Sequence, residues 1–252
     1  MNNSKSAKSF SVAFIFFSLL LALCAAMLLF FGNYLEKKTG EVKSVIESEE
    51  IARIPCCVVI DAGHGGEDGG TVSADGVLEK DLNLELSKIL YDLFRANGTD
   101  AQMTRTEDKM LYDNYPDEYR KGRKKMLDLR ARVEAAEKTE GAILLSIHMN
   151  SYPDASCRGA QVYYSPNNDE SHNIAGKIQT YIAANLQKDN GRKIKSADDD
   201  IYLLYRTKCP AVLVECGFLS NPEETKLLSD DAYRKKLACA IFASIADYLG
   251  AS

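Results

Sequence analysis

The chain has 252 residues, a length compatible with one large domain or two small ones. Its hydrophobic content of 46% and charged content of 27% are ordinary for a globular protein with a buried core. The net charge of −5 gives no basis for nucleic-acid binding, and the seven cysteines form no CxxC pair, which argues against a zinc knuckle. A disulfide between Cys157 and Cys209 remains an alternative if the domain is exported.

The N-terminal part is predicted to hold a membrane anchor. Residues 10–31 contain no charged side chain, and a helix of that length spans roughly 33 Å, enough for a hydrocarbon core of about 30 Å. The apolar run continues past the small residues at 22–26, which favours an uncleaved anchor over residues 10–32, although a cleaved and secreted form stays open. Lys5 and Lys8 assign the leader, residues 1–9, to the cytoplasm, so the domain is expected outside a single-pass anchor in the cell membrane.

The charged stretch of residues 33–54 is predicted to be a linker, and residues 55–252 to be a catalytic domain in which strands alternate with helices. Strands are expected at 57–60, 101–105, 142–150, 159–164, 201–204 and 211–214. Helices are expected at 79–97, 126–141, 170–187 and 232–249, with a further helix start at 220–224. This alternation predicts an α/β fold with an open, largely parallel, twisted sheet that has helices on both faces.

Three apolar strands each end in a titratable side chain: His64 in a glycine-rich loop, His148 and Glu215. In a mainly parallel sheet such strand ends gather at one edge, where α/β proteins bind ligands. Glu79, in the first turn of the helix after the glycine loop, is a candidate fourth member. Two histidines and one carboxylate are a common catalytic zinc set, and a second carboxylate can transfer protons.

Structural explanations exist for each residue taken alone. Glu79 is also suited to a helix N-terminus, His148 to a hydrogen-bonded position in the core, and Glu215 to a pair with an arginine. His172 is expected to be an exposed helical residue, and the run 198–200 a solvated acidic loop. The basic run 120–125, in a charged stretch that begins at residue 107, is interpreted as a solvated insertion or helix start, with contact to an anionic polymer as the alternative.

Residues 57–250 resemble the zinc-dependent N-acetylmuramoyl-L-alanine amidases of bacterial cell walls, the amidase type 3 family. The matching segments are Val59-Ile60-Asp61-Ala62-Gly63-His64-Gly65-Gly66, Leu78-Glu79-Lys80-Asp81-Leu82-Asn83-Leu84, Thr104-Arg105-Thr106-Glu107-Asp108, Leu129-Arg130-Ala131-Arg132, Ser146-Ile147-His148-Met149-Asn150, and Pro210-Ala211-Val212-Leu213-Val214-Glu215-Cys216-Gly217-Phe218-Leu219-Ser220-Asn221. Two departures are mild: Ala62 stands where many members have proline, and residues 109–125 are a longer insertion.

The resemblance implies one zinc ion held by His64, Glu79 and His148, with Glu215 as the catalytic acid/base. Asp61, Ser146 and Asn150 are candidates for supporting the ligands or shaping the loop, because a ligating histidine normally needs a partner for its other ring nitrogen.

The implied activity is hydrolysis of the amide between N-acetylmuramic acid and L-alanine of the stem peptide, so the implied partners are the peptidoglycan glycan strand and stem peptide. No cell-wall-binding repeat is recognised, so localisation is expected to depend on the anchor and on protein partners, with an activating protein as one candidate. A small anchored amidase of this layout is similar to the germination-related cortex amidases of spore formers. Two alternatives stay open: a non-catalytic wall-binding or recruiting protein with an amidase fold, and a zinc peptidase that cleaves within the stem peptide.

Overall fold

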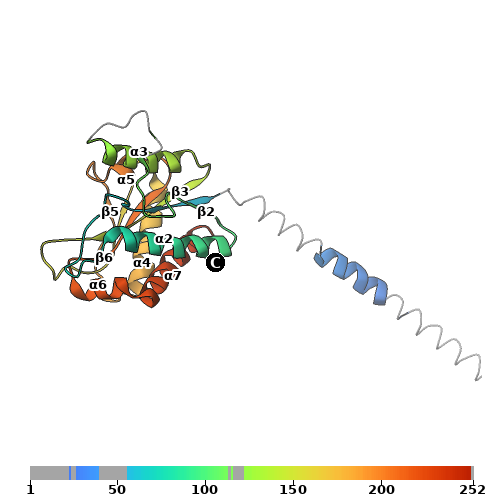
Figure 1. Ribbon diagram of the computed structural model, residues 1–252. Coiled ribbons are helices and arrows are strands. Elements are labelled where there is room, and N and C mark those ends of the chain that lie inside the picture. The colour runs from blue at the N-terminus through green and yellow to red at the C-terminus, as the bar shows by residue number, and fades with distance from the viewer. Residues whose placement is uncertain (1–22, 24–26, 40–55, 113–114, 116–121, 251–252) are drawn as a thin grey trace, which may run out of the picture. The chain divides into compact units, whose positions relative to one another are not determined.

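The computed structural model describes residues 23, 27–39, 56–112, 115 and 122–250. The chain divides into a small unit, residues 1–54, and a large unit, residues 55–252. The large unit contains a six-stranded sheet with the strand order β2-β1-β3-β6-β4-β5 (Figure 1). The strands are β1 (Cys57–Ala62), β2 (Asp100–Met103), β3 (Ala142–Asn150), β4 (Gln161–Tyr164), β5 (Lys195–Ser196) and β6 (Ala211–Phe218).

Four neighbouring strands of the sheet are parallel, and the two strands at one edge run in the opposite direction. Strands β2, β1, β3 and β6 are parallel to one another, whereas β4 runs antiparallel to β6 and β5 follows the direction of β4. The antiparallel pairing places Gln161, at the start of β4, opposite Glu215, near the end of β6. The predicted α/β sheet is therefore confirmed, with the reversed β4–β5 edge as its departure from a parallel arrangement.

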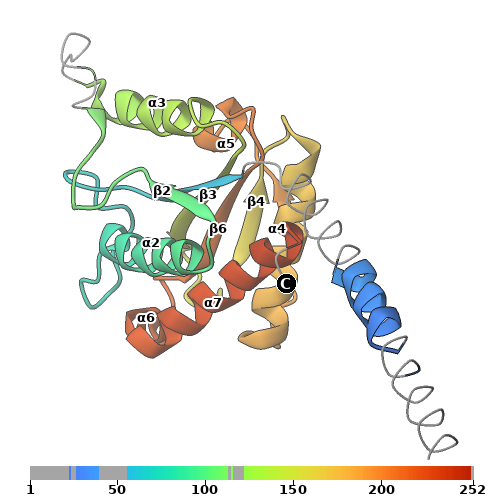
Figure 2. The same ribbon diagram turned by 90° about the vertical axis from the view of Figure 1, so that its right-hand side faces the viewer.

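Helices cover both faces of the sheet, as predicted (Figures 1 and 2). Helices α2, α4 and α7 lie on one face with α6 beside them, and α3 and α5 lie on the other. Their bounds are α2 (Glu79–Ala96), α3 (Lys124–Glu137), α4 (Asp169–Asn185), α5 (Tyr202–Arg206), α6 (Pro222–Ser229) and α7 (Asp231–Tyr248).

The central strands are apolar over most of their length because both of their faces are buried. Val58 and Ile60 belong to the apolar cluster on the side of α2, α4 and α7, whereas Val59 belongs to a smaller cluster on the other side. Each of the three side chains is fully buried. Successive residues of a strand point to opposite faces, so a strand covered on both faces reads as a nearly continuous apolar run.

The prediction of a strand at residues 201–204 is wrong, because residues 202–206 form helix α5. Leu203 and Leu204 are buried in the smaller apolar cluster, and a short apolar run does not distinguish a buried strand from a buried helical turn. The edge position beside β4 is occupied instead by β5, whose two residues Lys195 and Ser196 are both exposed and carry no apolar pattern.

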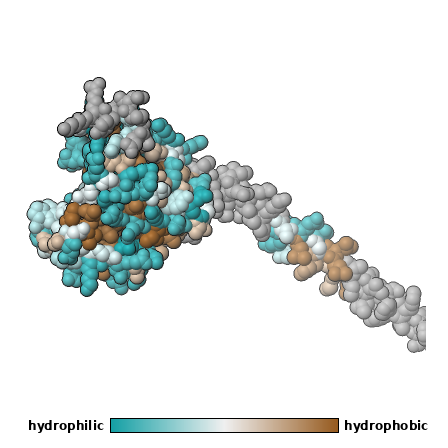
Figure 3. All heavy atoms as spheres, viewed as in Figure 1, coloured by the Kyte–Doolittle hydropathy of each residue, from teal (hydrophilic) through white to brown (hydrophobic). Residues whose placement is uncertain are grey.

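In the small unit, residues 27–39 are helical. Figure 3 shows apolar side chains gathered at one end of this helix and polar ones at the other, in line with the exposed Leu28 and Phe30. No helix within the described ranges is both long and apolar enough to cross a membrane. The predicted leader, residues 1–9, and most of the predicted anchor and linker lie outside those ranges.

Candidate metal centre

The loop after β1 holds His64 in the left-handed backbone conformation. Its φ is 62°, and no other described residue except glycines has a positive φ. A residue with a Cβ pays a steric cost there, so the surroundings must stabilise the conformation. Arg132 donates from Nη2 to the carbonyl oxygen of His64 at 2.7 Å. Gly65 and Asp68 close the loop with two reciprocal backbone hydrogen bonds of 2.9 and 3.1 Å.

Two buried arginines fix the backbone beneath this loop. Arg105 donates to the carbonyl oxygens of Ala62 and Gly63 at 2.8 and 3.0 Å. Arg132 donates from Nη1 to the Ala62 carbonyl oxygen at 2.8 Å and to Asp61 Oδ1 at 2.6 Å. Both arginines are almost fully buried, at 1% and 2% exposure. Because charge-assisted hydrogen bonds are stronger than neutral ones, this network restrains the loop.

Glu79 begins α2 and is held from several sides. Its Oε2 accepts a hydrogen bond from the backbone N–H of Thr71 at 2.9 Å. Its Oε1 accepts from the backbone N–H of Met149 at 3.1 Å and from Nδ2 of Asn83 at 3.2 Å. With 4% exposure, the carboxylate is buried, and its orientation is set by contacts from α2, β3 and the glycine loop.

The two predicted histidines meet at this carboxylate. His64 Nε2 lies 3.2 Å and His148 Nδ1 lies 2.9 Å from the same oxygen, Glu79 Oε1. One ligand atom from each of the three residues lies within 4.8 Å of the others. Because zinc binds imidazole nitrogen and carboxylate oxygen at about 2.0–2.2 Å, three donors of this kind and spacing are compatible with one ion.

The electrostatics of the cluster favour a strong negative centre between two imidazoles. Burial acts to raise the pKa of Glu79, but hydrogen bonds to His148 and His64 outweigh it and hold this pKa far below its usual range. Burial likewise opposes a charged His64, yet Asp68 and Glu79 raise its pKa to about 9. A divalent cation would replace the proton that these attractions favour on His64, because metal ligands bind deprotonated.

Glu215 lies directly beside the cluster. Its Cα pairs in register with that of His148 on the neighbouring strand β3. Burial raises its pKa to about 7, partly offset by the attraction of His148. Its Oε2 is buried and has no hydrogen-bond partner within the described part of the chain. A buried carboxyl group with a pKa near neutrality and a free oxygen is suited to accept and return a proton.

Two glycines leave the space that the cluster occupies. A Cβ on Gly63 would lie 2.3 Å from Nε2 of His148, and a Cβ on Gly70 would lie 2.4 Å from Oε2 of Glu79. Both distances are far below van der Waals contact, so any side chain there would displace a residue of the cluster. These glycines and the His/Glu/His donor set together fit a bound zinc ion.

The other predicted site residues lie near the cluster but not in it. Asp61 Oδ2 accepts from Ser146 Oγ at 2.7 Å, and Asp61 Oδ1 accepts from Thr104 Oγ1 at 2.7 Å. Both Asp61 and Ser146 are completely buried under the loop, where they complete the arginine network. Asn150, at the end of β3, accepts from the backbone N–H of Ser151 at 2.7 Å and makes no described hydrogen bond to the cluster.

Sequence reasoning missed the residue closest to the second ring nitrogen of His64. Asp68 Oδ2 lies 2.9 Å from His64 Nδ1, the position that supports a ligating histidine. The signal that could have identified Asp68 is its position in the same glycine-rich loop, four residues after His64. Arg105 and Arg132 were also missed as supports, although both stand in segments that resemble the amidases.

Part of the charged insertion contacts the glycine loop. Lys124 donates to Glu67 Oε1 at 2.6 Å, and Lys125 pairs with Asp68 Oδ2. Asp108 Oδ1 accepts from the backbone N–H of Gly66 at 2.7 Å. Residues 113–114 and 116–121 of the insertion lie outside the described ranges. The described flanks of the insertion thus form ion pairs and a backbone hydrogen bond beside the His64/Glu79/His148 cluster.

The remaining chemical candidates stay away from the cluster. His172 is exposed on α4 and packs edge-on against Tyr164, with ring centroids 5.1 Å apart. The acidic run Asp198–Asp200 is exposed, as expected for a solvated loop. The described cysteines are all free, so Cys157 and Cys209 are not joined in a disulfide.

Comparison with known proteins assigns the family. The family model described as N-acetylmuramoyl-L-alanine amidase matches residues 58–247. The chain belongs to the N-acetylmuramoyl-L-alanine amidase family. A similar relative is the germination-specific N-acetylmuramoyl-L-alanine amidase of Bacillus subtilis (strain 168), 37% identical over 191 residues, which cover 76% of this chain and 78% of the relative.

Solved amidase structures share the fold. The CwlD amidase from Clostridioides difficile, in complex with the GerS lipoprotein, is 35% identical with a TM-score of 0.73, over 78% of this chain and 100% of that one. The catalytic domain of the amidase CwlV from Bacillus (Paenibacillus) polymyxa var. colistinus is 28% identical with a TM-score of 0.66, over 78% and 99% of the two chains. The amidase match includes every strand and helix that carries the cluster.

Proposed function

We propose that His64, Glu79 and His148 hold one zinc ion, and that the site hydrolyses the amide between N-acetylmuramic acid and L-alanine of the peptidoglycan stem peptide. The observation that carries this proposal is the convergence of both imidazoles on Glu79 Oε1, with Glu215 beside His148. A zinc ion held there would polarise the scissile carbonyl and acidify a bound water.

Glu215 supplies the proton transfers. Its Oε2 accepts a proton from the attacking water while the water oxygen forms a bond to the carbonyl carbon. The carbon–nitrogen bond then breaks, and the same carboxyl group delivers the proton to the departing amine of L-alanine. Burial raises the pKa of Glu215 in the metal-free protein and so opposes the lowering that a nearby cation would cause, which supports both transfers by this carboxyl group. Asp68 holds His64 from its far side, and the two arginines keep the loop in place.

The proposed substrate is spore-cortex peptidoglycan, and a protein partner is part of the proposal. The germination-specific name of the relative from B. subtilis supports the cortex. The solved complex of the CwlD amidase with a lipoprotein supports an activating or positioning partner. The proposed ligands of this chain come from β3, α2 and the loop after β1, so a partner that tightened any one of them would affect the centre.

Product analysis tests the reaction. Zinc-loaded protein is incubated with purified cortex peptidoglycan, and the released material is analysed by mass spectrometry. Free stem peptides with an N-terminal L-alanine are expected. Peptides that lack L-alanine would indicate a zinc peptidase instead, and no release by the fully loaded protein would indicate a non-catalytic wall-binding role.

The variant Glu215→Gln is the matched test of the acid/base. It should keep its zinc, measured by metal analysis, and lose activity by about 10²–10⁴-fold, the usual contribution of a general acid/base. Unchanged activity would remove Glu215 from the mechanism.

We further propose that residues 10–32 anchor the protein in the cell membrane with the catalytic domain outside. The uncharged run of residues 10–31 supports this proposal. Fractionation of cells that express the full chain, followed by N-terminal sequencing, tests it. An intact N-terminus in the membrane fraction is expected, whereas a soluble form that begins after residue 26 would identify a cleaved signal peptide.

A further inference from the structure

Arg192, in the segment before β5, is a rigidly held cation near the end of β6. Its Nε donates to the carbonyl oxygen of Arg158 at 2.7 Å, and its Nη1 donates to Gln161 Oε1 at 3.4 Å. The guanidinium carbon lies 4.5 Å from the ring centroid of Phe218. Gln161 and Phe218 are themselves buried, with 4% and 3% exposure. The arginine is therefore oriented by two hydrogen bonds and one aromatic ring, and its side chain stays partly exposed.

These partners place Arg192 at the catalytic edge of the sheet. Gln161 pairs in register with Glu215, and Phe218 pairs with Asn150 at the end of β3. The register shift between His148 and Asn150 leaves Phe218 opposite a residue two positions beyond the proposed ligand. Gln161, which Arg192 contacts, therefore lies on the strand directly beside Glu215.

Among the residues that the structure describes, no carboxylate forms an ion pair with Arg192. No ion pair within the described ranges includes it, and none of the described hydrogen bonds uses its Nη2. Glu224 is within electrostatic range, but its two oxygens accept from the backbone N–H groups of Gly159 and Phe218. A half-buried guanidinium that keeps N–H donors free of protein acceptors can bind an anion there.

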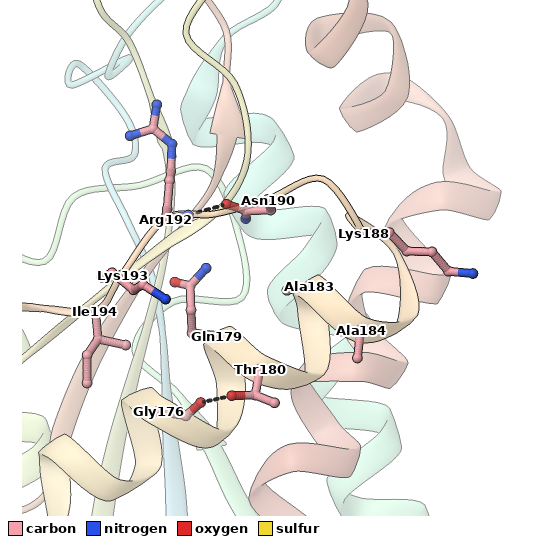
Figure 4. Close-up of a pocket in the computed structure, with 10 residues that line it drawn as sticks. All are labelled: Gly176, Gln179, Thr180, Ala183, Ala184, Lys188, Asn190, Arg192, Lys193 and Ile194. Atoms are coloured by element: carbon pink, nitrogen blue, oxygen red, sulfur yellow. Dashed lines mark hydrogen bonds between the residues drawn. The ribbon is translucent and has the colours of Figure 1, made fainter.

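Arg192 differs in direction from its basic neighbours. A pocket of about 530 Å³ is lined by residues of α4 and of the segment before β5, and Figure 4 shows these residues. Lys193 points toward Gln179 on α4, whereas the guanidinium of Arg192 extends away from α4. Tyr163, on β4, lies within electrostatic range of both Glu215 and Arg192. Burial raises the pKa of its hydroxyl group, the charge of Glu215 adds to that rise, and the charge of Arg192 opposes it.

We propose that Arg192 binds a carboxylate of the stem peptide and thereby determines which peptides are cleaved. The proposal rests on the function proposed above and extends it, because the peptide that leaves from Glu215 carries free carboxylates beyond L-alanine. A guanidinium is suited to this role since its planar array of N–H donors matches the two oxygens of a carboxylate. Arg192 is thus a specificity-determining residue outside the metal centre.

The test compares substrates that differ by one charge. N-acetylmuramoyl tripeptides are prepared with each stem-peptide carboxylate in turn converted to a carboxamide. The unmodified protein should favour one free carboxylate by at least about tenfold in kcat/KM. Arg192→Gln should lose about 10–100-fold in kcat/KM on that substrate, mainly through KM, and change less than about twofold on its carboxamide counterpart, because only the free carboxylate forms a charge-assisted hydrogen bond with the guanidinium. Arg192→Lys should recover part of the loss, since it keeps the charge but not the planar donors.

Lys188→Gln is the matched control, because Lys188 lines the pocket and makes no described contact with Gln161 or Phe218. It should leave both substrates unaffected. Equal losses on the carboxylate and carboxamide substrates would overturn the proposal, and so would an unchanged Arg192→Gln. If the unmodified protein cleaves neither the carboxylate nor the carboxamide substrate, the proposed function fails. The role of Arg192 is then tested by calorimetry, which measures binding of the free tripeptide to the unmodified protein and to Arg192→Gln. Equal affinities would reject the proposed role of Arg192.

Discussion

His148 Nδ1 lies 2.9 Å from Glu79 Oε1, although the two residues are 69 positions apart in the chain. Together with His64 they form a ready donor set, so Glu79→Gln should weaken zinc binding by more than the roughly 10–100-fold typical of an outer-shell change. The amide keeps the size of the side chain but removes its charge. Competition with a chromophoric chelator measures the affinity, and Glu223→Gln, at an exposed position of α6, is the control. Equal affinities in the two variants would contradict the proposed ligand.

The support of His64 by Asp68 gives a second prediction. Asp68→Asn should lower zinc affinity by about 10–100-fold, because Asp68 Oδ2 lies 2.9 Å from the second ring nitrogen. Lys125→Ala, which removes the partner of that same oxygen, should cost less than about tenfold, because exposed ion pairs contribute at most about 1 kcal/mol. Lys138→Ala, at the opposite end of α3, should leave zinc affinity unchanged. A reversed order of the first two effects would refute this arrangement.

Space at Gly63 is a third testable feature. Gly63→Ala should lower both zinc affinity and the free energy of unfolding, the latter by about 1–3 kcal/mol, since its Cβ would collide with the His148 ring. Gly176→Ala is the matched control, because its Cβ meets nothing within 4 Å inside helix α4. That change should raise stability by about 0.5–1 kcal/mol. Denaturant unfolding of metal-free protein, paired with the chelator assay, separates the two effects.

The raised pKa of Glu215 predicts a pH-dependent change in stability. In metal-free protein the folded state binds this proton more tightly than the unfolded state, with a pKa of about 7 against an ordinary 4.5. The carboxylate therefore destabilises the fold progressively as pH rises from about 4.5 to 7. Glu215→Gln removes this cost, so it should raise the free energy of unfolding by about 3 kcal/mol at pH 8 and by little at pH 4. A gain that is the same at both pH values would exclude a raised pKa.

The proposed chemistry could be predicted where local pattern and position agree. The apolar runs before His64, His148 and Glu215 predict buried strands, and strand ends of a parallel sheet meet at one edge. Glu79 was found because it follows the glycine loop at the start of a helix. In these cases the residues next to each site residue in the sequence already indicate its position in the fold.

The supports could not be predicted in the same way, because their burial depends on packing between distant segments. Arg132 belongs to a helix with many charged residues, a pattern normal for a solvated face. Only the packing of α3 against β1 and β3 shows that its guanidinium lies beneath the loop. The strand prediction for residues 201–204 was wrong for a related reason, since four apolar residues suit a helical turn as well as a strand.

The reversal of β4 has a consequence for how the enzyme can diversify. The segment leading into β5 reaches the reaction edge from a direction used by none of the proposed zinc ligands. On the proposed role of Arg192, replacements along this border would alter which wall fragments are accepted without changing the proposed zinc ligands. Substrate selection and catalysis would then depend on different strands of one sheet and could evolve independently.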